Sequence, residues 1–255
     1  MARSFETPAA ANLAPDAALE FDTVHEFDTV PRPDTASGFE AAEDESAAMA
    51  TAVATAHPRN LIIACGAIAA ELVAVVNRNG LDAVRIQCLP AEWHNRPERI
   101  TPGIRKLLEE HHEYCDHIFI AYGDCGTGGL LDALLEEYPG VERLPGDHCY
   151  SFFAGSDVFE TLSEEELASF YLTDYLARNF ERLIIKGFGL DRHPELMDMM
   201  FGNYKRMVYL AQTEPPARLA EAEAAAVALN LPLVVVNTGL APFTNVIPIR
   251  NLAHG

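Results

Sequence analysis

The sequence predicts an α/β fold with a mainly parallel sheet of about six strands and helices on both faces. Apolar runs of strand length alternate with stretches whose apolar residues recur at helical spacing, which is the pattern of repeated strand–helix units. Glycine follows four of the apolar runs, at Gly66, Gly123, Gly187 and Gly239, where the chain needs a turn. An acidic segment without such runs comes first, so the α/β domain is expected over residues 58–255.

The strands and helices are expected in regular alternation. The predicted strands are Asn60–Cys65, Ala83–Cys88, the apolar part of Ile118–Gly129, Arg182–Lys186, Arg206–Leu210 and Leu231–Val236. Helices are expected after Gly66, from Thr101, from Leu130, from Ser163 and from Pro215. The glycine turns allow two interpretations: a duplication into two βαβ halves, or the ordinary need for a turn after a buried strand, which we prefer.

Two of the helix starts carry capping signals. Thr101 and Pro102 suit the N-cap and the first helical position. Ser163 and Glu166 have the spacing of a capping box, which predicts a helix with Phe170 on its inner face.

Residues 1–57 are predicted to be a disordered acidic tail. They are rich in Ala, Pro, Thr and Asp and hold few large apolar groups, so they bury too little surface to fold. The motif EFDTV occurs twice there, at Glu20–Val24 and Glu26–Val30. It is either a docking motif for a partner or part of a solvated tail, and the solvated tail is the default interpretation.

Charge and composition narrow the classes of function. The formal net charge of −20 argues against binding to nucleic acid or to an anionic membrane surface. No apolar run is long enough to cross a bilayer, and the N-terminus lacks the apolar core of a secretory signal. We therefore expect a cytoplasmic protein with a small-molecule substrate, whose five cysteines are thiols rather than disulfides.

The stretch Ile118–Gly129, IFIAYGDCGTGG, is the centre of the prediction. It combines a buried strand with a tight turn that carries Asp124 and Cys125, and ligands of parallel sheets bind at such strand ends. The turn amides are expected to hold an anionic group at the start of the next helix. They belong to Gly126, Thr127, Gly128 and Gly129.

Cysteines gather at the ends of the predicted strands. Cys65 ends the first strand, Cys125 follows the third, and Cys149 lies beside His148 in a loop at the same end of the sheet. Thiolate and imidazole ligands favour a transition metal, either zinc or an iron–sulfur cluster. We predict a metal site formed by Cys65, Cys125, Cys149 and His148, with His94 or His148 at the wall of its pocket.

Catalytic roles are assigned to groups near these strand ends. Asp124, Lys186 and His94 are the expected general acid–base or substrate-binding residues. In the alternative hypothesis Cys125 is the nucleophile of a hydrolase or transferase and His148 is its base. That alternative leaves the thiols of the other two strand-end loops without a role.

Four phrases in this order, ACGAIAAEL, LPAEWHNRPERI, YGDCGTGG and GDHCYSFFAG, resemble the bacterial and archaeal proteins grouped as domain of unknown function 1638. The resemblance covers about Leu61 to Thr213. It implies a setting of corrinoid-dependent one-carbon metabolism, with corrinoid proteins or methyltransferases as partners. The chain would then be a metal-dependent methyltransferase or related transferase, or an accessory protein. Asp191 and His193 follow a corrinoid-binding pattern only in part, which argues against direct corrinoid binding.

Overall fold

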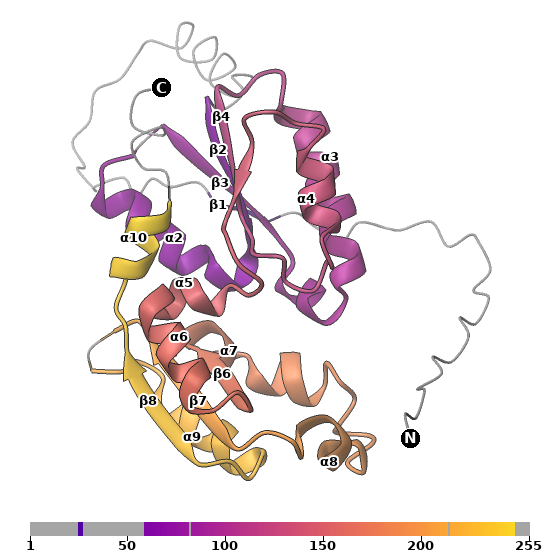
Figure 1. Cartoon of the computed structure of the whole chain (residues 1–255), viewed down its shortest axis with the longest axis vertical. Helices are drawn as coiled ribbons and strands as arrows, with labels where there is room; N and C mark the ends of the chain where they lie inside the picture. The colour runs from indigo at the N-terminus through magenta and orange to yellow at the C-terminus, as the bar shows by residue number, and fades with distance from the viewer. Residues whose placement is uncertain (1–24, 28–58, 82, 214, 248–255) are drawn as a thin grey trace, which may run out of the picture.

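The chain forms two parallel sheets joined through a shared core (Figure 1). This computed structural model describes residues 25–27, 59–81, 83–213 and 215–247. We call residues 59–165 the N-terminal half and residues 166–247 the C-terminal half. The predicted α/β class with parallel strands is confirmed, but the strands are divided between two sheets instead of lying in one.

The N-terminal sheet has the order β1-β3-β2-β4-β5, and all its neighbours are parallel except β1. Its strands are β1 (His25–Phe27), β2 (Asn60–Cys65), β3 (Val84–Leu89), β4 (His117–Ala121) and β5 (Glu142–Arg143). The predicted strands of this half are therefore present, within a residue or two of their expected bounds. The central strand β2 is wholly buried, as its unbroken apolar run requires.

Helices cover both faces of this sheet (Figure 1). The helices α3 (Ile100–His111) and α4 (Leu130–Leu135) lie together on one face, and α2 (Ala69–Arg78) covers the other. Two short helices, α5 (Tyr150–Ala154) and α6 (Ser156–Glu165), lead toward the second sheet. The helix start predicted at Thr101 falls inside α3, which begins one residue earlier.

The C-terminal sheet has the order β6-β7-β8 and is entirely parallel. Its strands are β6 (Ser169–Thr173), β7 (Arg206–Ala211) and β8 (Leu233–Asn237). The helices of this half are α7 (Asp174–Arg178), the π-helical turn η4 (Glu181–Ile185), α8 (Leu196–Phe201), α9 (Leu219–Ala228) and α10 (Ala241–Val246).

Two predicted elements of this half are wrong. The helix expected from Ser163 is the strand β6, because the aromatic and apolar residues of Ser169–Thr173 suit a pleated surface better than a helix. Ser163 lies inside α6, so it caps nothing, and Leu167 just after it is 88% exposed. The strand expected at Arg182–Lys186 is the π-helical turn η4, whose short apolar run is buried between elements and not in a sheet.

The two halves share one buried core, and a second core lies within the C-terminal half. Val208 and Leu210 of β7 belong to the same buried cluster as the residues of β2. The last helix, α10, returns to the N-terminal half, where Phe243 contacts Phe153 edge to face with ring centroids 5.0 Å apart. The C-terminal sheet is therefore held directly beneath the carboxyl ends of the N-terminal strands, where the candidate site lies (Figure 1).

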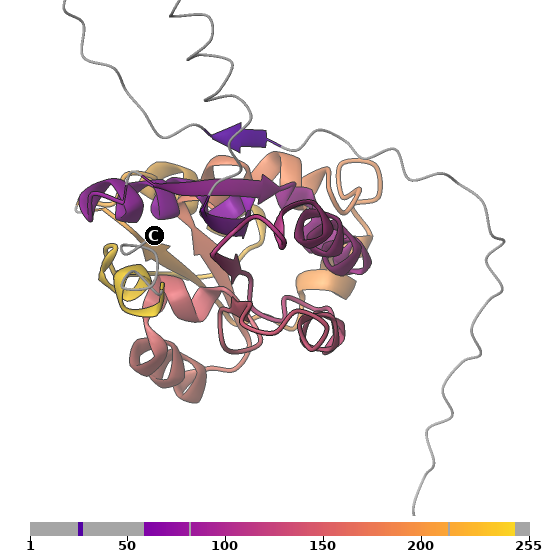
Figure 2. The same cartoon turned by 90° about the horizontal axis from the view of Figure 1, so that it is seen from above.

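One short part of the predicted tail is a strand. β1 pairs antiparallel with β3, with His25 opposite Cys88, at the outer edge of the sheet (Figure 2). The rest of the predicted tail and the repeat at Glu20–Val24 lie outside the described residues. Within the described part of the chain, no helix has both the length and the apolar character needed to cross a membrane.

Candidate metal centre

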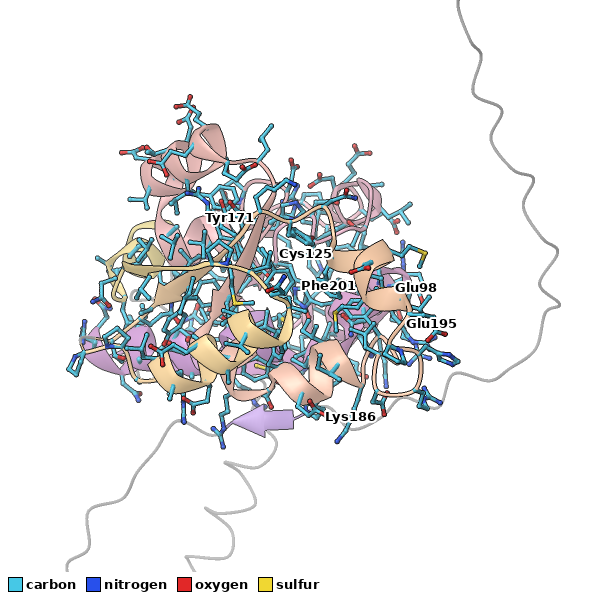
Figure 3. The ribbon with its side chains drawn as sticks, turned by 90° about the horizontal axis from the view of Figure 1, so that it is seen from below. Glu98, Cys125, Tyr171, Lys186, Glu195 and Phe201 are labelled. Carbon is cyan, nitrogen blue, oxygen red and sulfur yellow. The ribbon has the colours of Figure 1, made fainter. Side chains whose placement is uncertain are left out.

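Four sulfur- and imidazole-bearing residues meet below the N-terminal sheet. Cys65 is the last residue of β2, and His94 lies in the short 3-10 turn η2 (Ala91–Asn95) that follows β3. Cys125 lies on the turn after β4, and Cys149 immediately precedes α5. Since parallel strands end at the same edge of a sheet, the loops that follow them converge there. Figure 3 shows Cys125 in the interior of the molecule.

His94, Cys125 and Cys149 are placed as a set of metal ligands. One ligand atom from each of them lies within 4.8 Å of the ligand atoms of the other two. The imidazole ring stands between two sulfurs, with Nδ1 3.4 Å from Sγ of Cys65 and Nε2 4.0 Å from Sγ of Cys149. All three sulfurs are buried, so the group is shielded from bulk solvent.

The charges within this group favour a thiolate at Cys125 beside a protonated imidazole. Hydrogen bonding from Cys149, and then from His94, lowers the pKa of Cys125 to about 5. The negative charge of Cys65 is the main cause that raises the pKa of His94 well above its ordinary value. The pKa of Cys149 is raised well above its ordinary value, chiefly because its thiol donates a hydrogen bond to Cys125 that deprotonation would remove. Cys125 is therefore the group most ready to act as a ligand or nucleophile.

The backbone at Cys125 is unusual for a residue with a side chain. Its φ of 49° lies in the left-handed region, which non-glycine residues rarely adopt. Two hydrogen bonds hold this turn to the loop that carries Cys149: the Asp124 N–H donates to Gly146 O over 3.0 Å, and the Cys125 N–H donates to Asp147 O over 2.8 Å. The surrounding structure thus fixes a strained residue next to its sulfur partner, as is common at functional sites.

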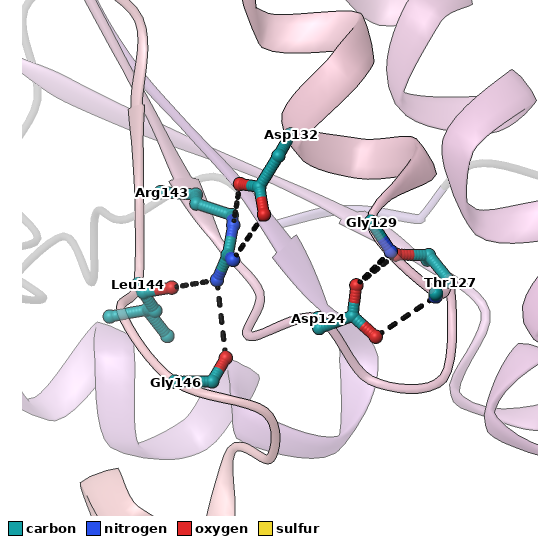
Figure 4. Close-up of polar contacts among 8 residues, drawn as sticks. Asp124, Thr127, Gly129, Asp132, Arg143, Leu144 and Gly146 are labelled. Atoms are coloured by element: carbon teal, nitrogen blue, oxygen red, sulfur yellow. Dashed lines mark hydrogen bonds and ion pairs between the residues drawn. The ribbon is translucent and has the colours of Figure 1, made fainter.

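Asp124 shapes the turn from within. Its carboxylate accepts hydrogen bonds from the Thr127 hydroxyl at 2.7 Å, the Gly129 N–H at 2.8 Å and the Gly128 N–H at 3.0 Å (Figure 4). These bonds, that of Thr127 first, lower the pKa of Asp124. The amides of Gly128 and Gly129, predicted to hold an anionic ligand, therefore already have an anion of the protein itself.

Arg143 fastens the loop that leads to Cys149. Its guanidinium donates to both carboxylate oxygens of Asp132 on α4, with Nη2 2.8 Å from Oδ2 (Figure 4). It also donates to the carbonyl oxygens of Leu144 and Gly146, at 2.6 and 3.2 Å. The ion pair of Arg143 and Asp132 thus holds the carbonyl group of Gly146 in place. The same carbonyl oxygen accepts a hydrogen bond from the Asp124 N–H.

Two residues of the predicted site lie away from the sulfurs. His148 is exposed, and its backbone carbonyl accepts a hydrogen bond from the Ser151 hydroxyl. Lys186 is exposed at the periphery, where its ammonium lies 3.8 Å from Glu181 (Figure 3). Among the described residues the imidazole brought to the sulfurs is that of His94, which was predicted as a wall or catalytic residue.

Cys65 contacts the opposite edge of the His94 ring from Cys149. Its sulfur lies 3.4 Å from Nδ1 and also accepts the N–H of Ala67 at 3.3 Å. A metal held by Nε2 would leave Nδ1 to such a partner, which is how imidazole ligands are usually oriented. The geometry therefore suits Cys65 as the group that positions His94, where the sequence predicted a ligand.

Tyr122 is a member of the site that the sequence analysis did not single out. Its side chain is 1% exposed, and its hydroxyl finds no partner of good hydrogen-bond geometry among the described residues. Burial, and then the charges of Cys65 and Cys125, raise the pKa of Tyr122 well above its ordinary value. Its position directly after β4 and two residues before Asp124 is the signal by which it could have been found. The hydroxyl is a proton donor that stays neutral beside the sulfurs.

A small cavity reaches His94 and Cys149 from the C-terminal half. Its volume is about 90 Å³, enough for a few water molecules or a small ligand group. Tyr150 and Phe153 form its wall on the N-terminal side, and residues of β6, α7 and η4 close it from below. His94 and Cys149 therefore border a small, largely apolar space.

Comparison with known proteins gives a family but no characterised relative. The family described as "Protein of unknown function (DUF1638)" matches residues 88–247, which is more than half of the chain. The match includes His94, Cys125 and Cys149 and the whole C-terminal half, and it begins after Cys65. No curated protein and no solved structure shows significant similarity to the chain.

Proposed function

Because the chain belongs to the DUF1638 family, whose function is unknown, we propose its role from the site: it is a metal-binding protein whose His94, Cys125 and Cys149 hold one transition metal ion. The observation that carries this proposal is the convergence of the three ligand atoms within 4.8 Å. Ligand atoms that share a zinc ion lie roughly 3.5–4 Å apart, so the group needs only a small contraction to close on an ion.

The donor set fits a borderline-soft metal. Two sulfurs and one imidazole nitrogen favour zinc or iron over magnesium or calcium. Three protein ligands leave one tetrahedral position open, which distinguishes catalytic zinc sites from closed structural ones. The cavity beside His94 and Cys149 supports this interpretation, because it offers space for a fourth ligand from outside the protein.

The protein side of the chemistry follows from the neighbours of the ligands. Zinc bound there would act as a Lewis acid that activates a bound water or substrate thiol. Cys65 would fix the ring of His94, and the Tyr122 hydroxyl would donate a hydrogen bond to charge that develops near the sulfurs. The apolar walls of Tyr150 and Phe153 would keep bulk water away from the bound group.

The place of this activity in metabolism is a further proposal. Activation of a thiol suits methyl or other group transfer, which agrees with a role as a transferase or accessory protein in corrinoid-linked methyl metabolism. This link, and a corrinoid protein or methyltransferase as partner, rests on the family resemblance alone and stays a prediction.

Metal analysis of purified variants tests the proposal. We expect about one zinc or iron ion per chain, and cobalt exchanged into the site should show thiolate-to-metal absorption. Cys125→Ser, Cys149→Ser and His94→Ala should each remove most of the metal, and a second replacement should add little, because the ligands act as a unit. Cys115→Ser is the matched control, since Cys115 is a half-buried thiol outside the group. Full metal content in the Cys125→Ser and Cys149→Ser variants would refute the proposal.

A cysteine nucleophile is the second candidate. The lowered pKa of Cys125, about 5, and its strained position on a strand-to-helix turn favour it. Its base would be His94 and not the exposed His148, because a ring nitrogen of His94 lies within 4.8 Å of the Cys125 sulfur. Two experiments separate the candidates: alkylation of the thiols in metal-free protein, and activity measurements on variants. If Cys125 is the nucleophile, its loss alone abolishes activity, while Cys149→Ser has a mild effect.

A further inference from the structure

A second, larger hollow lies beside the turn η2, and none of the three candidate metal ligands lines it. Its volume is about 660 Å³, which falls in the range of small-molecule sites, about 300–1,000 Å³. We call it the arginine cleft, because Arg96, Arg99 and Arg182 line it. It lies where the two halves of the chain meet, and such junctions are common ligand sites.

The cleft carries an excess of positive charge in a strongly acidic protein. Glu92 is the only acidic residue in its lining, and it forms an ion pair with Arg182. Arg182 also donates to the side-chain oxygens of Tyr175 and Asn179, so its guanidinium is held in place. The side chains of Arg96 and Arg99 make no ion pair or side-chain hydrogen bond within the described part of the chain.

Two unmatched guanidinium groups in one cleft need an explanation, because the formal net charge of the whole chain is −20. A chain with many more acidic than basic groups offers abundant partners for surface arginines. Arg99 is nevertheless only half-exposed and still forms no ion pair with a carboxylate among the described residues. Guanidinium forks match carboxylate and phosphate oxygens in geometry, which makes an anionic ligand the natural partner.

Part of the cleft lining is apolar. It contains Trp93, the only tryptophan of the chain, with Leu89 and Pro90. The indole ring packs against Gly103 of α3 so closely that a Cβ there would lie 2.2 Å from a ring carbon. A ligand that fits this lining has a flat or apolar body in addition to its charged group.

We propose that the arginine cleft binds a small anionic molecule, a carboxylate or a phosphate, with its charged group on Arg96 and Arg99 and its body against Trp93. This site goes beyond the proposed metal function and does not depend on it. The two spaces are nevertheless neighbours, because Ala91, Asn95, Tyr175 and Leu183 line both the cleft and the small cavity beside His94. A ligand in the cleft would therefore touch the same turn that carries His94.

Binding of simple aromatic anions tests the proposal directly. Benzoate and phenyl phosphate represent the two anion classes, and benzamide is the neutral control of similar shape. Titration calorimetry decides binding, and Trp93 fluorescence reports its location. We expect at least one anion to bind and to change the fluorescence, while benzamide binds at least tenfold more weakly. The stronger of the two anions identifies the class of headgroup.

Variants assign the binding to the two arginines. Arg96→Gln and Arg99→Gln should each weaken the stronger anion by about tenfold or more, because each removes a charge-assisted hydrogen bond. Arg78→Gln, an exposed arginine on α2 outside the cleft, should leave the affinity unchanged. Thermal unfolding of each variant checks that the fold is intact, and both arginines reach solvent, so their loss leaves no cavity.

The outcome is separable from that of the metal proposal. Protein treated with a chelator should bind the anion as well as untreated protein, because no candidate metal ligand lines the cleft. Equal binding of benzamide, absence of calorimetric binding by both anions, or equal losses in the Arg78→Gln and Arg96→Gln variants would overturn the assignment.

Discussion

Glu71 on α2 should make the stability of the fold depend on pH. Its side chain is 6% exposed, and Oε2 has no hydrogen-bond partner among the described residues. Burial is the main cause that raises the pKa of Glu71 from its ordinary 4.5 to about 7, and the charge of Asp174 on the facing C-terminal half adds to it. The carboxyl group is therefore more easily protonated in the folded chain than in the unfolded chain.

The size and sign of the effect follow from these two pKa values. Below pH 4.5 the group is protonated in both states and contributes nothing. Between pH 4.5 and about 7 the folded state binds more protons than the unfolded state, so the free energy of unfolding falls as the pH rises. At about 1.4 kcal/mol per tenfold change in the proton equilibrium, the total loss is roughly 3 kcal/mol, complete above pH 7.

Denaturant unfolding of Glu71→Gln between pH 5 and pH 8 measures this contribution. We expect the free energy of unfolding of the variant, minus that of the parent, to rise by roughly 2.5 kcal/mol across this range, because part of the total change lies below pH 5. The difference matters because carboxylates with lowered pKa, such as Asp124, change stability only at lower pH. Glu109→Gln on α3 is the control, since Glu109 is exposed. Parallel pH profiles of the parent and the Glu71→Gln variant would show that the reasoning is wrong.

Three further perturbations test the site and its surroundings. In metal-free protein the thiolate absorbance near 240 nm should titrate with a midpoint near pH 5 and should be lost in Cys125→Ser, whereas a midpoint near 9 would contradict the charge arrangement. Asp124→Ala removes three hydrogen bonds from the turn and should cost about 2 kcal/mol in unfolding free energy and weaken metal binding, with Asp132→Ala as comparison. Gly103→Ala should cost about 1–3 kcal/mol and shift the Trp93 emission, because the added methyl meets the indole ring.

The sequence predicts the N-terminal half well because its central strands β2 and β4 are buried on both faces. A run such as Asn60–Cys65 has one interpretation when it is followed by a turn and a helical pattern. The C-terminal half is harder, since Ser169–Thr173 and Arg182–Lys186 are both short apolar segments of ambiguous periodicity. Tertiary packing decided these two segments: the first pairs with β7, and the second is buried as a turn between the halves.

The predicted ends of the buried strands also located part of the site. Strand ends place Cys125 and Cys149 together, and the structure brings their sulfurs into one group. The choice of imidazole followed adjacency in the chain, which favoured His148. Neighbouring residues of a loop point in different directions, so Cys149 is buried while His148 faces solvent. His94 comes from a distant turn, and only the packing of that turn determines where its ring lies.

That packing gives the C-terminal half a direct part in the site. Asn95, the residue after His94, donates a hydrogen bond to the carbonyl of Leu183 over 2.9 Å, and Glu92 of the same turn pairs with Arg182. The hydrogen bond between Asn95 and Leu183 requires glycine at position 187. A Cβ there would lie 2.0 Å from the Leu183 oxygen and 2.8 Å from the Asn95 amide nitrogen, so any side chain would collide with both groups. The turn that carries His94 is thus clamped by η4 of the C-terminal half. Without η4, this turn would lose the contacts that fix the position of the His94 imidazole.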